Sequence, residues 1–308
     1  MSGATPRVSI CIPAYEQVVY LERTLDSIAG QDLTDIEVIV SDDSRGDAVK
    51  ELVERYRAVF GEKLRYVRNR PALGSPANWN ATMALASGEL VKIMHHDEWF
   101  ASPTSLRAFV ELMDRSGADA AFSAVRTTAV DEGRDWTLCP SDAEVEALRL
   151  VPDRILLANL IGPPSAVIHK RSLGLRYDTR FTYVVDMVFY RELLLHHRVE
   201  RTPEVLIRSV SGAGHNVSAA CQVPDIELRE YLEAIDDRWA LMSAAVRPAF
   251  RRLVFGLLVK YAVTDMRAFR RYHPRWSGRG PYRWLVMKAK AYTLVRPLSG
   301  GRKNPVNA

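Results

Sequence analysis

The strongest constraint on the fold of this chain is an alternation of two kinds of segment. Short apolar runs that end abruptly in polar residues alternate with segments of helical periodicity. Buried strands are predicted at residues 7–13, 36–40, 64–67 and 90–94, and helices at residues 20–29, 47–60 and 76–86. This alternation favours an α/β fold with a mostly parallel, Rossmann-like sheet flanked by helices. Ligands of such sheets bind beyond the carboxyl ends of the strands, so chemistry is expected at that edge.

The later part of the chain continues the pattern less regularly. Residues 127–150 are polar, acidic and poorly periodic, and are interpreted as a long loop over the site with a marginal helix at residues 143–148. The other expected elements are helices at residues 105–116, 186–196 and from 225 onward, and strands at residues 118–125, 165–169 and 198–210.

The run at residues 90–94 delivers four polar side chains to the predicted sheet edge: His95, His96, Asp97 and Glu98. All four side chains can bind a metal ion. The alternative is that Asp97 or Glu98 caps the helix expected after residue 103. No GxGxxG or GxxxxGK[ST] motif occurs in the chain, so a bound pyrophosphate would be neutralised by a metal ion held on carboxylates, with Asp97 as the first candidate.

Composition narrows the setting in which the protein acts. The three cysteines, Cys11, Cys139 and Cys221, are far apart and form no CxxC pair, so neither a disulfide framework nor a structural zinc site is indicated, and a reducing cytosol fits best. The sequence suggests no signal peptide and no membrane-spanning helix. Residues 247–303 hold fifteen Lys and Arg against one acid, whereas the remainder holds 27 bases and 36 acids. Such a basic tail is expected to meet an anionic partner.

Five separated segments resemble glycosyltransferase family 2, the inverting nucleotide-sugar-dependent enzymes with a GT-A fold. The similarity lies in residues 8–15, 38–44, 74–89, 95–99 and 184–187, in the family's order and at plausible spacings. It covers about residues 7–218 and leaves the basic tail outside. The resemblance implies a GT-A catalytic domain over residues 1–224 and a helical basic extension over residues 225–308.

The resemblance assigns a nucleotide-sugar pocket to the first two strand ends and the helix that follows the third strand. Turn chemistry is the alternative for the strand-end residues. Asn78 and Asn80 do not share a helix face, so Asn78 is taken as the contact. The implied nucleotide-sugar contacts are Pro13, Ala14, Tyr15, Glu16, Asp42, Asp43, Asn78, His95 and His96.

The family's metal motif, Asp-x-Asp, is changed in this chain to His95-His96-Asp97. The resemblance implies that Asp97 binds Mg²⁺ or Mn²⁺ on the diphosphate. His95 either touches the nucleotide, donates a hydrogen bond, packs, or binds the metal ion, in which case Mn²⁺ suits it better than Mg²⁺. Glu98 is expected to help shape the site.

Asp186 resembles the family's catalytic base. Inversion at the anomeric carbon requires a carboxylate that takes the proton of the acceptor hydroxyl. The alternative is that Asp186 is the N-cap of the helix beginning there, and the two roles can coexist. His215, in the loop at residues 212–218, is a further candidate metal ligand or phosphate contact, although a loop histidine often has neither role.

Two amphipathic segments, residues 248–269 and 281–295, carry aromatic and basic residues in the tail. They suit a membrane interface, or alternatively pack on the catalytic body or a second subunit of a homo-oligomer. Nucleic acid is not expected, because no recognised binding motif accompanies the charge.

The expected protein is a cytoplasmic, metal-dependent inverting glycosyltransferase, peripheral at the inner face of the cell membrane if the tail binds there. Its donor would be a UDP, dTDP or GDP sugar, its acceptor a glycan or lipid-linked molecule, and its role the synthesis of a cell-surface polysaccharide or other glycoconjugate. The change at His95 keeps two alternatives open: a non-catalytic nucleotide-sugar-binding or membrane-associated scaffold, or an adaptor with a vestigial domain.

Overall fold

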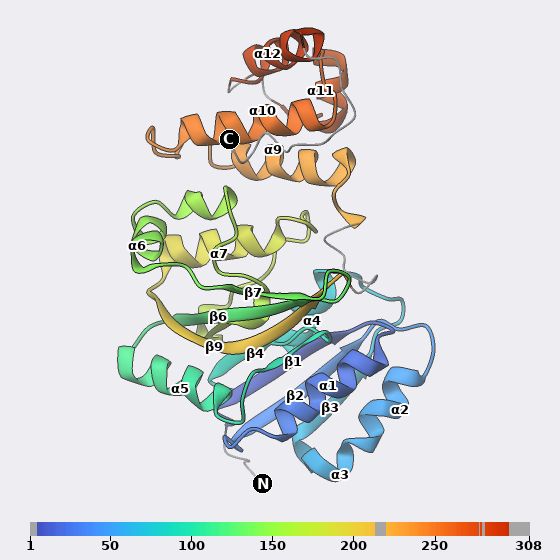
Figure 1. The fold of residues 1–308 in the computed structure, drawn as a ribbon. Coiled ribbons are helices and arrows are strands. Elements are labelled where there is room, and N and C mark those ends of the chain that lie inside the picture. Colours follow the sequence, from blue (N-terminus) through green and yellow to red (C-terminus); the bar gives the residue numbers. More distant parts are fainter. Residues whose placement is uncertain (1–4, 213–219, 277, 279–280, 296–308) are drawn as a thin grey trace.

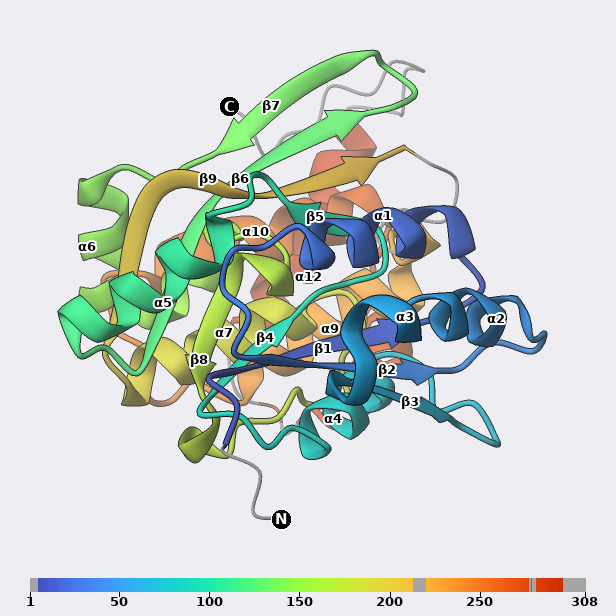
Figure 2. The ribbon, with the colours of Figure 1, turned by 90° about the horizontal axis from the view of Figure 1, so that it is seen from below.

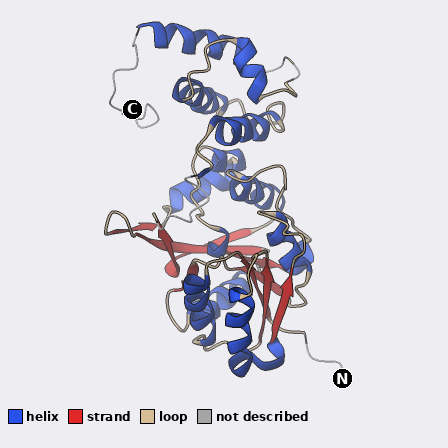
Figure 3. Ribbon diagram, turned by 90° about the vertical axis from the view of Figure 1, so that its right-hand side faces the viewer, coloured by secondary structure: helices blue, strands red, loops and turns tan. Residues whose placement is uncertain are grey.

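A computed structural model describes residues 5–212, 220–276, 278 and 281–295. Its centre is a nine-stranded sheet with the order β3-β2-β1-β4-β8-β6-β9-β5, and β7 pairs with β6 beside this path (Figure 1). Helices cover both faces of the sheet, and a further group of helices extends from one of those faces (Figures 1 and 3). This arrangement confirms the α/β fold class.

The four strands that come first in the chain are parallel to one another, as the strand–helix alternation predicted. The strands are β1 (Val8–Ala14), β2 (Ile36–Asp42), β3 (Leu64–Arg68) and β4 (Leu90–Ile93). The helices between them are α1 (Val18–Ala29), α2 (Ala48–Arg55), α3 (Arg57–Phe60) and α4 (Ala77–Ala84). Their carboxyl ends therefore meet at one edge of the sheet, where the site was expected.

The second half of the sheet is mixed in direction. The strand β8 (Val167–Lys170) is antiparallel to both β4 and β6 (Ala120–Ala129), whereas β9 (Val199–Ser211) is parallel to β6. A three-residue strand, β5 (Glu98–Phe100), is antiparallel to β9. It was not predicted, because three residues are too few to show a period-two pattern.

The prediction of a long loop was wrong for residues 127–138, whereas the helix expected at residues 143–148 is confirmed. The chain forms a hairpin of β6 with β7 (Arg134–Leu138), followed by α6 (Asp142–Leu150). The strand β7 is an exposed edge strand whose apolar residues are Trp136 and Leu138, too few to mark a buried strand. The helix α6 begins with a capping box between Ser141 and Glu144, a signal that is present in the sequence.

Alternate residues of the central strand β1 face two separate hydrophobic clusters. Val8, Ile10 and Ile12 pack with α1, α2 and α5 (Ser105–Ser116) on one face. Cys11 packs with α4 and α7 (Val185–His196) on the other face. Side chains of a strand alternate between faces, so one buried heptapeptide serves both layers. Figure 2 looks onto the side of the sheet that α1, α2 and α3 cover, with α7 behind the strands.

A close backbone approach explains the glycine that precedes β4. A Cβ atom on Gly88 would lie 2.7 Å from Ser9 Oγ and 2.8 Å from Ser9 N. The N–H of Gly88 donates to Ser9 Oγ at 2.8 Å. Only glycine fits here without displacing β1, whose far end carries the site.

The carboxyl-terminal helices stack outward from the α7 side of the sheet (Figure 3). They are a π-helical turn (Pro224–Leu228), α9 (Arg229–Asp236), α10 (Arg247–Lys260), α11 (Met266–Tyr272) and α12 (Tyr282–Val295). Short 3-10 turns elsewhere are Gly61–Lys63, Pro152–Leu156, Pro164–Ala166 and Arg171–Leu173. Leu193 of α7, Leu232 of α9, Phe250 of α10 and Val286 of α12 belong to one hydrophobic cluster.

The inward faces of α10 and α12 therefore pack within the helical stack, against one another and beside α9, and their packing on the catalytic body itself stays a prediction. Phe250, Leu258, Leu285 and Val286 are all buried. Within the described ranges, no helix is long and apolar enough to cross a membrane.

Candidate active site

A cavity of about 800 Å³ lies where β1 and β4 end. This volume falls within the range of small-molecule sites. Its walls also include residues from α4, from the turn after β2 and from the start of α7, so segments far apart in the chain converge on it. The predicted site residues that line it are Pro13, Ala14, Tyr15, Asp43, Asn78, His95, His96, Asp97 and Asp186.

Two of the predicted nucleotide contacts, Glu16 and Asp42, do not line the cavity. The Asp42 carboxylate is fully buried and accepts hydrogen bonds from Tyr66 Oη at 2.7 Å and from Ser44 N at 2.8 Å. Glu16 has a positive φ of 60°, and its carboxylate accepts from the N–H of Arg45 at 2.9 Å. These contacts favour turn roles for both, and their contact with a ligand stays a prediction. His215 lies outside the described residues.

Asp43 and Asn78 order the wall around Gly74. The Asp43 carboxylate accepts from the N–H groups of Leu73 at 3.0 Å and Gly74 at 2.8 Å, and from Asn69 Nδ2 at 2.9 Å. Asn78 donates to the carbonyl of Ser41 at 3.0 Å. Both side chains are therefore held in fixed orientations against the cavity before any ligand binds.

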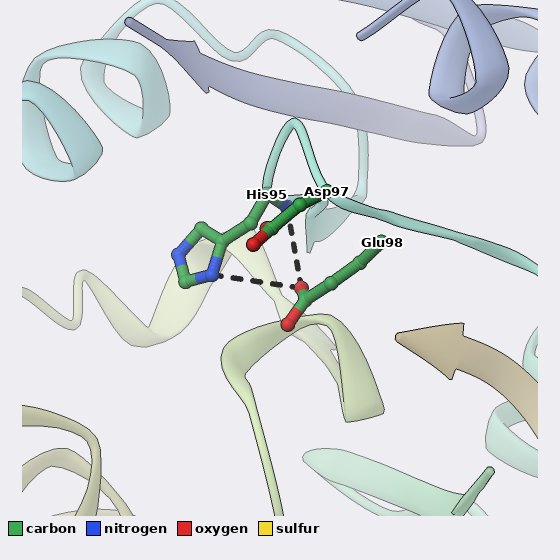
Figure 4. A group of neighbouring side chains, drawn as sticks. All are labelled: His95, Asp97 and Glu98. Carbon is green, nitrogen blue, oxygen red and sulfur yellow. Dashed lines mark hydrogen bonds and ion pairs between the residues drawn. The ribbon is translucent and has the colours of Figure 1, made fainter. Parts of the chain in front are cut away.

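His95 and Asp97, in the turn between β4 and β5, form a cluster with Glu98, the first residue of β5 (Figure 4). One ligand atom from each lies within 4.8 Å of those of the other two. His95 Nδ1 lies 3.5 Å from Glu98 Oε2, and the Nε2 atom of the same ring is buried without a hydrogen-bond partner among the described residues. On the other side of the turn, Thr24 Oγ1 of α1 donates to the carbonyl of Glu98 at 2.7 Å.

The charges in this cluster stabilise one another. Burial opposes protonation of His95, but the charge and hydrogen bond of Glu98, with the charges of Asp97 and Asp186, outweigh it and raise the pKa of the imidazole. Burial likewise favours the neutral form of Glu98, yet the interactions with His95 lower the pKa of this carboxyl. The pair is therefore a buried ion pair, and a cation bound beside it would replace the proton on the imidazole.

This donor set fits a divalent cation. Two carboxylates and an imidazole within reach of one ion suit Mn²⁺, and also Mg²⁺ if the carboxylates alone bind it. The Asp-x-Asp motif would place a second carboxylate at position 95, where this chain has a histidine. In this chain the second carboxylate near Asp97 belongs to Glu98. Its side chain is 7% exposed and comes from the unpredicted strand β5.

Asp186 lies in the first turn of α7 and faces the same cavity. Its Oδ2 accepts from Asn159 Nδ2 at 2.8 Å, and its Oδ1 accepts from the N–H of Met187 at 2.8 Å. Burial raises the pKa of Asp186 to about 6, against the opposing effect of the backbone N–H groups of Met187 and Asp186 and of the His95 charge. The suggestion that Asp186 is the N-cap was wrong, because the N-cap is Val184.

Three features of the site were missed in the sequence. Trp79 lies beside His95, with ring centroids 4.5 Å apart. Asn159 orients Asp186. Glu230 of α9 accepts hydrogen bonds from the N–H groups of Thr182 at 2.9 Å, Tyr183 at 2.7 Å and Val184 at 3.2 Å, just before α7 begins. Of these three residues, only Trp79 could have been found from the sequence, because it lies between Asn78 and Asn80.

Comparison with known proteins identifies the class to which this fold and site belong. The family model described as "Glycosyl transferase family 2" matches residues 9–170, which is more than half of the chain. The chain belongs to glycosyltransferase family 2. The resemblance stated from the sequence is therefore confirmed.

Two relatives show the range of similarity. The chain is 28% identical over 219 residues to an uncharacterized protein of Mycobacterium tuberculosis, covering 67% of each chain. It is 33% identical over 94 residues to GalNAc(5)-diNAcBac-PP-undecaprenol beta-1,3-glucosyltransferase of Campylobacter jejuni, covering 30% of each. The chain thus spans about two thirds of the first relative and under a third of the second.

Solved structures share the fold. TarS of S. aureus in complex with UDP-GlcNAc superposes with a TM-score of 0.60 at 20% identity, over 83% of this chain and 72% of that one. The mannosyltransferase PcManGT of Pyrobaculum calidifontis, in complex with GDP-Man and Mn²⁺, gives 0.53 at 18% identity, over 96% of this chain and 89% of that one. These matches confirm the GT-A fold.

Proposed function

We propose that the protein transfers a sugar, with inversion, from a nucleotide diphosphate sugar to a hydroxyl acceptor. The observation that carries the proposal is the single cavity that brings a metal-competent cluster, His95, Asp97 and Glu98, together with the buried carboxylate of Asp186. Membership of glycosyltransferase family 2 supports the same chemistry.

The donor is proposed to bind along the ends of β1 and β2. Pro13, Ala14, Tyr15, Asp43 and Asn78 would line the nucleoside part, with Glu16 and Asp42 in support. A carboxylate can accept hydrogen bonds from a base or ribose, and the half-exposed ring of Tyr15 offers a face for stacking. UDP, dTDP and GDP sugars remain the candidate donors, and two of the structural relatives were solved with UDP-GlcNAc and with GDP-Man.

The diphosphate is proposed to lie at the turn after β4. Asp97 would bind Mg²⁺ or Mn²⁺, assisted by Glu98 and His95, and His95 and His96 would contact the donor. When bound, the cation would supply positive charge that stabilises the departing diphosphate. His215 is retained as a further candidate ligand of this ion.

Asp186 is proposed as the general base. The acceptor oxygen forms a bond to the anomeric carbon while the bond to the diphosphate oxygen breaks, and the hydroxyl proton passes to a carboxylate oxygen of Asp186. A pKa of about 6 leaves this carboxylate ionised near neutral pH while keeping it more basic than a solvated aspartate. Asn159 and the N–H of Met187 fix its direction, so that one geometry is presented to the acceptor.

The remaining parts of the proposal concern the setting. Residues 1–224 would form the catalytic domain and residues 225–308 its basic extension. The acceptor would be a glycan or a lipid-linked molecule in polysaccharide or other glycoconjugate synthesis, used in the cytoplasm at the inner face of the membrane. The name of the Campylobacter relative, which contains a PP-undecaprenol acceptor, supports a lipid-linked class.

Thermal-shift measurements with UDP, GDP, dTDP and CMP, each with and without Mn²⁺, test the donor site. One nucleoside diphosphate should raise the melting temperature, and it should do so only when the metal ion is present. The shift should be easy to measure, because a ligand at about 100 times its dissociation constant stabilises the fold by about 2.7 kcal/mol. Asp97→Ala should abolish the metal-dependent part. No shift with any nucleotide would contradict a nucleotide-sugar site.

A further inference from the structure

The helix α12 has apolar side chains on two opposite faces. On the inward face, Leu285, Val286 and Ala289 are at most 1% exposed. On the outward face, Trp284, Met287 and Leu294 are 54%, 66% and 74% exposed. Positions 284, 287 and 294 are three and seven residues apart, which places them on one side of a helix. Packing against α10 and α11 explains the inward face and leaves the outward stripe unexplained.

Basic residues flank this outward stripe. Arg283, Lys288 and Lys290 of α12 are exposed. Lys288 Nζ lies 5.1 Å from the ring centroid of Trp284, so the charge sits beside the exposed aromatic ring. From residue 266 to residue 295 the sequence contains eight Lys and Arg and no Asp or Glu. The end of the molecule formed by α11 and α12 is therefore strongly cationic.

The position of α12 makes the stripe accessible. It belongs to the outermost layer of the helical stack, on the far side of that stack from the sheet (Figures 1 and 3). None of its residues lines the donor cavity. A flat partner can therefore meet this end of the molecule without covering the sugar-transfer site.

We propose that the outward stripe of α12 binds the surface of an anionic lipid bilayer, with the helix lying along the interface. Trp, Met and Leu side chains would enter the boundary between headgroups and acyl chains, and the flanking Arg and Lys side chains would contact the anionic headgroups. This goes beyond the proposed sugar transfer, because it assigns the contact to one face of one helix and holds whether or not the cavity is catalytic.

Charge and composition together favour a bilayer over the other possible partners. A second copy of the chain would bring two cationic surfaces into contact, which like-charge repulsion opposes. The phosphates of a nucleic acid would be attracted to the basic side chains, but they offer no apolar surface on which Met287 and Leu294 could be buried. An anionic bilayer can bury the apolar side chains of the stripe and attract the basic side chains that flank it.

Vesicle flotation of the full chain tests the proposal, using phosphatidylcholine vesicles with and without phosphatidylglycerol. The apolar variant carries Trp284→Ser, Met287→Ser and Leu294→Ser. Its matched control removes three exposed apolar side chains from the amino-terminal half by Val19→Ser, Val59→Ser and Leu150→Ser, positions that are 74%, 59% and 73% exposed.

A second variant separates charge from apolar insertion. It carries Arg283→Glu, Lys288→Glu and Lys290→Glu, and its matched control carries Lys50→Glu, Lys63→Glu and Arg65→Glu, which are also exposed. Scanning calorimetry and nucleotide binding verify that each variant is folded. Quenching of Trp284 fluorescence by brominated lipid, compared with Trp284→Phe, reports whether this ring enters the bilayer.

The wild-type protein is expected to float with anionic vesicles and not with neutral ones. The apolar variant should bind at least about tenfold more weakly, and the charge variant about fivefold more weakly per residue changed, while both controls bind as the wild type. Equal binding by the apolar variant, or no quenching of Trp284, would overturn the proposal in favour of electrostatic adsorption alone. A lipid-free dimer that the apolar variant dissociates would overturn it in favour of self-association.

Discussion

Asn159 donates a hydrogen bond from Nδ2 to Oδ2 of Asp186 at 2.8 Å. The amide is itself locked, because its Oδ1 accepts from the N–H of Gly162 at 2.9 Å and its Nδ2 also donates to the Gly162 carbonyl at 2.9 Å. A donor fixed in this way favours the ionised form of the carboxylate and holds it in one orientation. The relationship assigns Asn159 as a positioning residue for the proposed base.

Asn159→Ala is therefore expected to slow turnover by about tenfold or more, with donor affinity unchanged. Removing a hydrogen bond to the charged form also raises the pKa of Asp186, so the acid limb of the pH–rate profile should move to higher pH. The profile distinguishes a positioning role from a general loss of stability. Asn80→Ala is the matched control, because the Asn80 amide bonds only the backbone of Tyr177 among the contacts seen and should leave the profile in place.

The cluster in the turn after β4 predicts a particular pattern of metal affinity. Asp97→Ala and Glu98→Gln should each weaken Mn²⁺ binding by about tenfold or more, since each removes a charged oxygen from a three-donor set. Mn²⁺ titration followed by electron paramagnetic resonance measures the affinity directly, and nitrogen coupling in the same spectra reports on His95. Glu62→Gln, an exposed acid ahead of β3, serves as the control. Unchanged affinity in Glu98→Gln would leave Asp97 as the sole carboxylate ligand in this turn.

Glu230 links the carboxyl-terminal helices to the start of α7. Its carboxylate is 1% exposed and accepts three backbone N–H groups, two of them from the cavity-lining residues Thr182 and Tyr183. Glu230→Ala leaves these donors unpaired in a buried position and should lower the free energy of unfolding by about 2–4 kcal/mol. Chemical denaturation measures the loss, with Glu233→Ala on the same helix as the control. The same contact predicts that a chain ending at residue 224 will be less stable than the full chain.

Lys92 provides a prediction that depends on pH. Its side chain is fully buried in β4, with Nζ 4.3 Å from the ring centroid of Phe109, and burial lowers its pKa to about 7, against the opposing charge of Glu98. Between pH 7 and the unfolded pKa of 10.5, the unfolded state binds more protons, so the folded state loses stability as the pH falls through this window.

Lys92→Met should therefore stabilise the protein, and by about 2 kcal/mol more at pH 6 than at pH 9. Urea denaturation at the two pH values gives the comparison. Lys170→Met is the matched control, because Lys170 is partly exposed and paired with Asp119. A pH-independent gain in Lys92→Met would show that the pKa of Lys92 is not lowered in the folded state, so that the lysine stays charged in both states.

The sequence pointed to the edge of the sheet where the candidate site lies, because parallel strands bring their carboxyl ends to one edge. Pro13 lies at the end of β1, Asp43 follows β2 and His95 follows β4, and all three line one cavity, as that topology requires. Asp186 was placed only by resemblance to the family, because nothing in its own helix distinguishes a base from a surface acid. The packing of Phe250 and Leu285 could be read only as one of several alternatives, since an amphipathic helix does not say what covers it.

The supporting contacts could not be predicted from the sequence. Asn159 and Asp186 are 27 residues apart, and Tyr183 and Glu230 are 47 residues apart, in segments with no shared periodicity. Glu98 was recognised as polar, but its burial depends on β5, a strand too short to predict. These contacts join single side chains that are far apart in the chain, and the periodicity of each segment does not predict them.

Turnover of a nucleotide sugar by the wild-type protein and by Asp186→Asn tests the central claim most directly. With the donor found by thermal shift and Mn²⁺ present, nuclear magnetic resonance should show the donor sugar transferred or hydrolysed with inversion at the anomeric carbon. The rate should rise with pH up to about 6 and then level, because only ionised Asp186 accepts the proton. Asp186→Asn should bind the donor normally, and its turnover should fall by about 10²-fold or more. Retention of anomeric configuration, or near-normal turnover by Asp186→Asn, would contradict the account, and donor binding without any turnover would favour a non-catalytic nucleotide-sugar-binding protein.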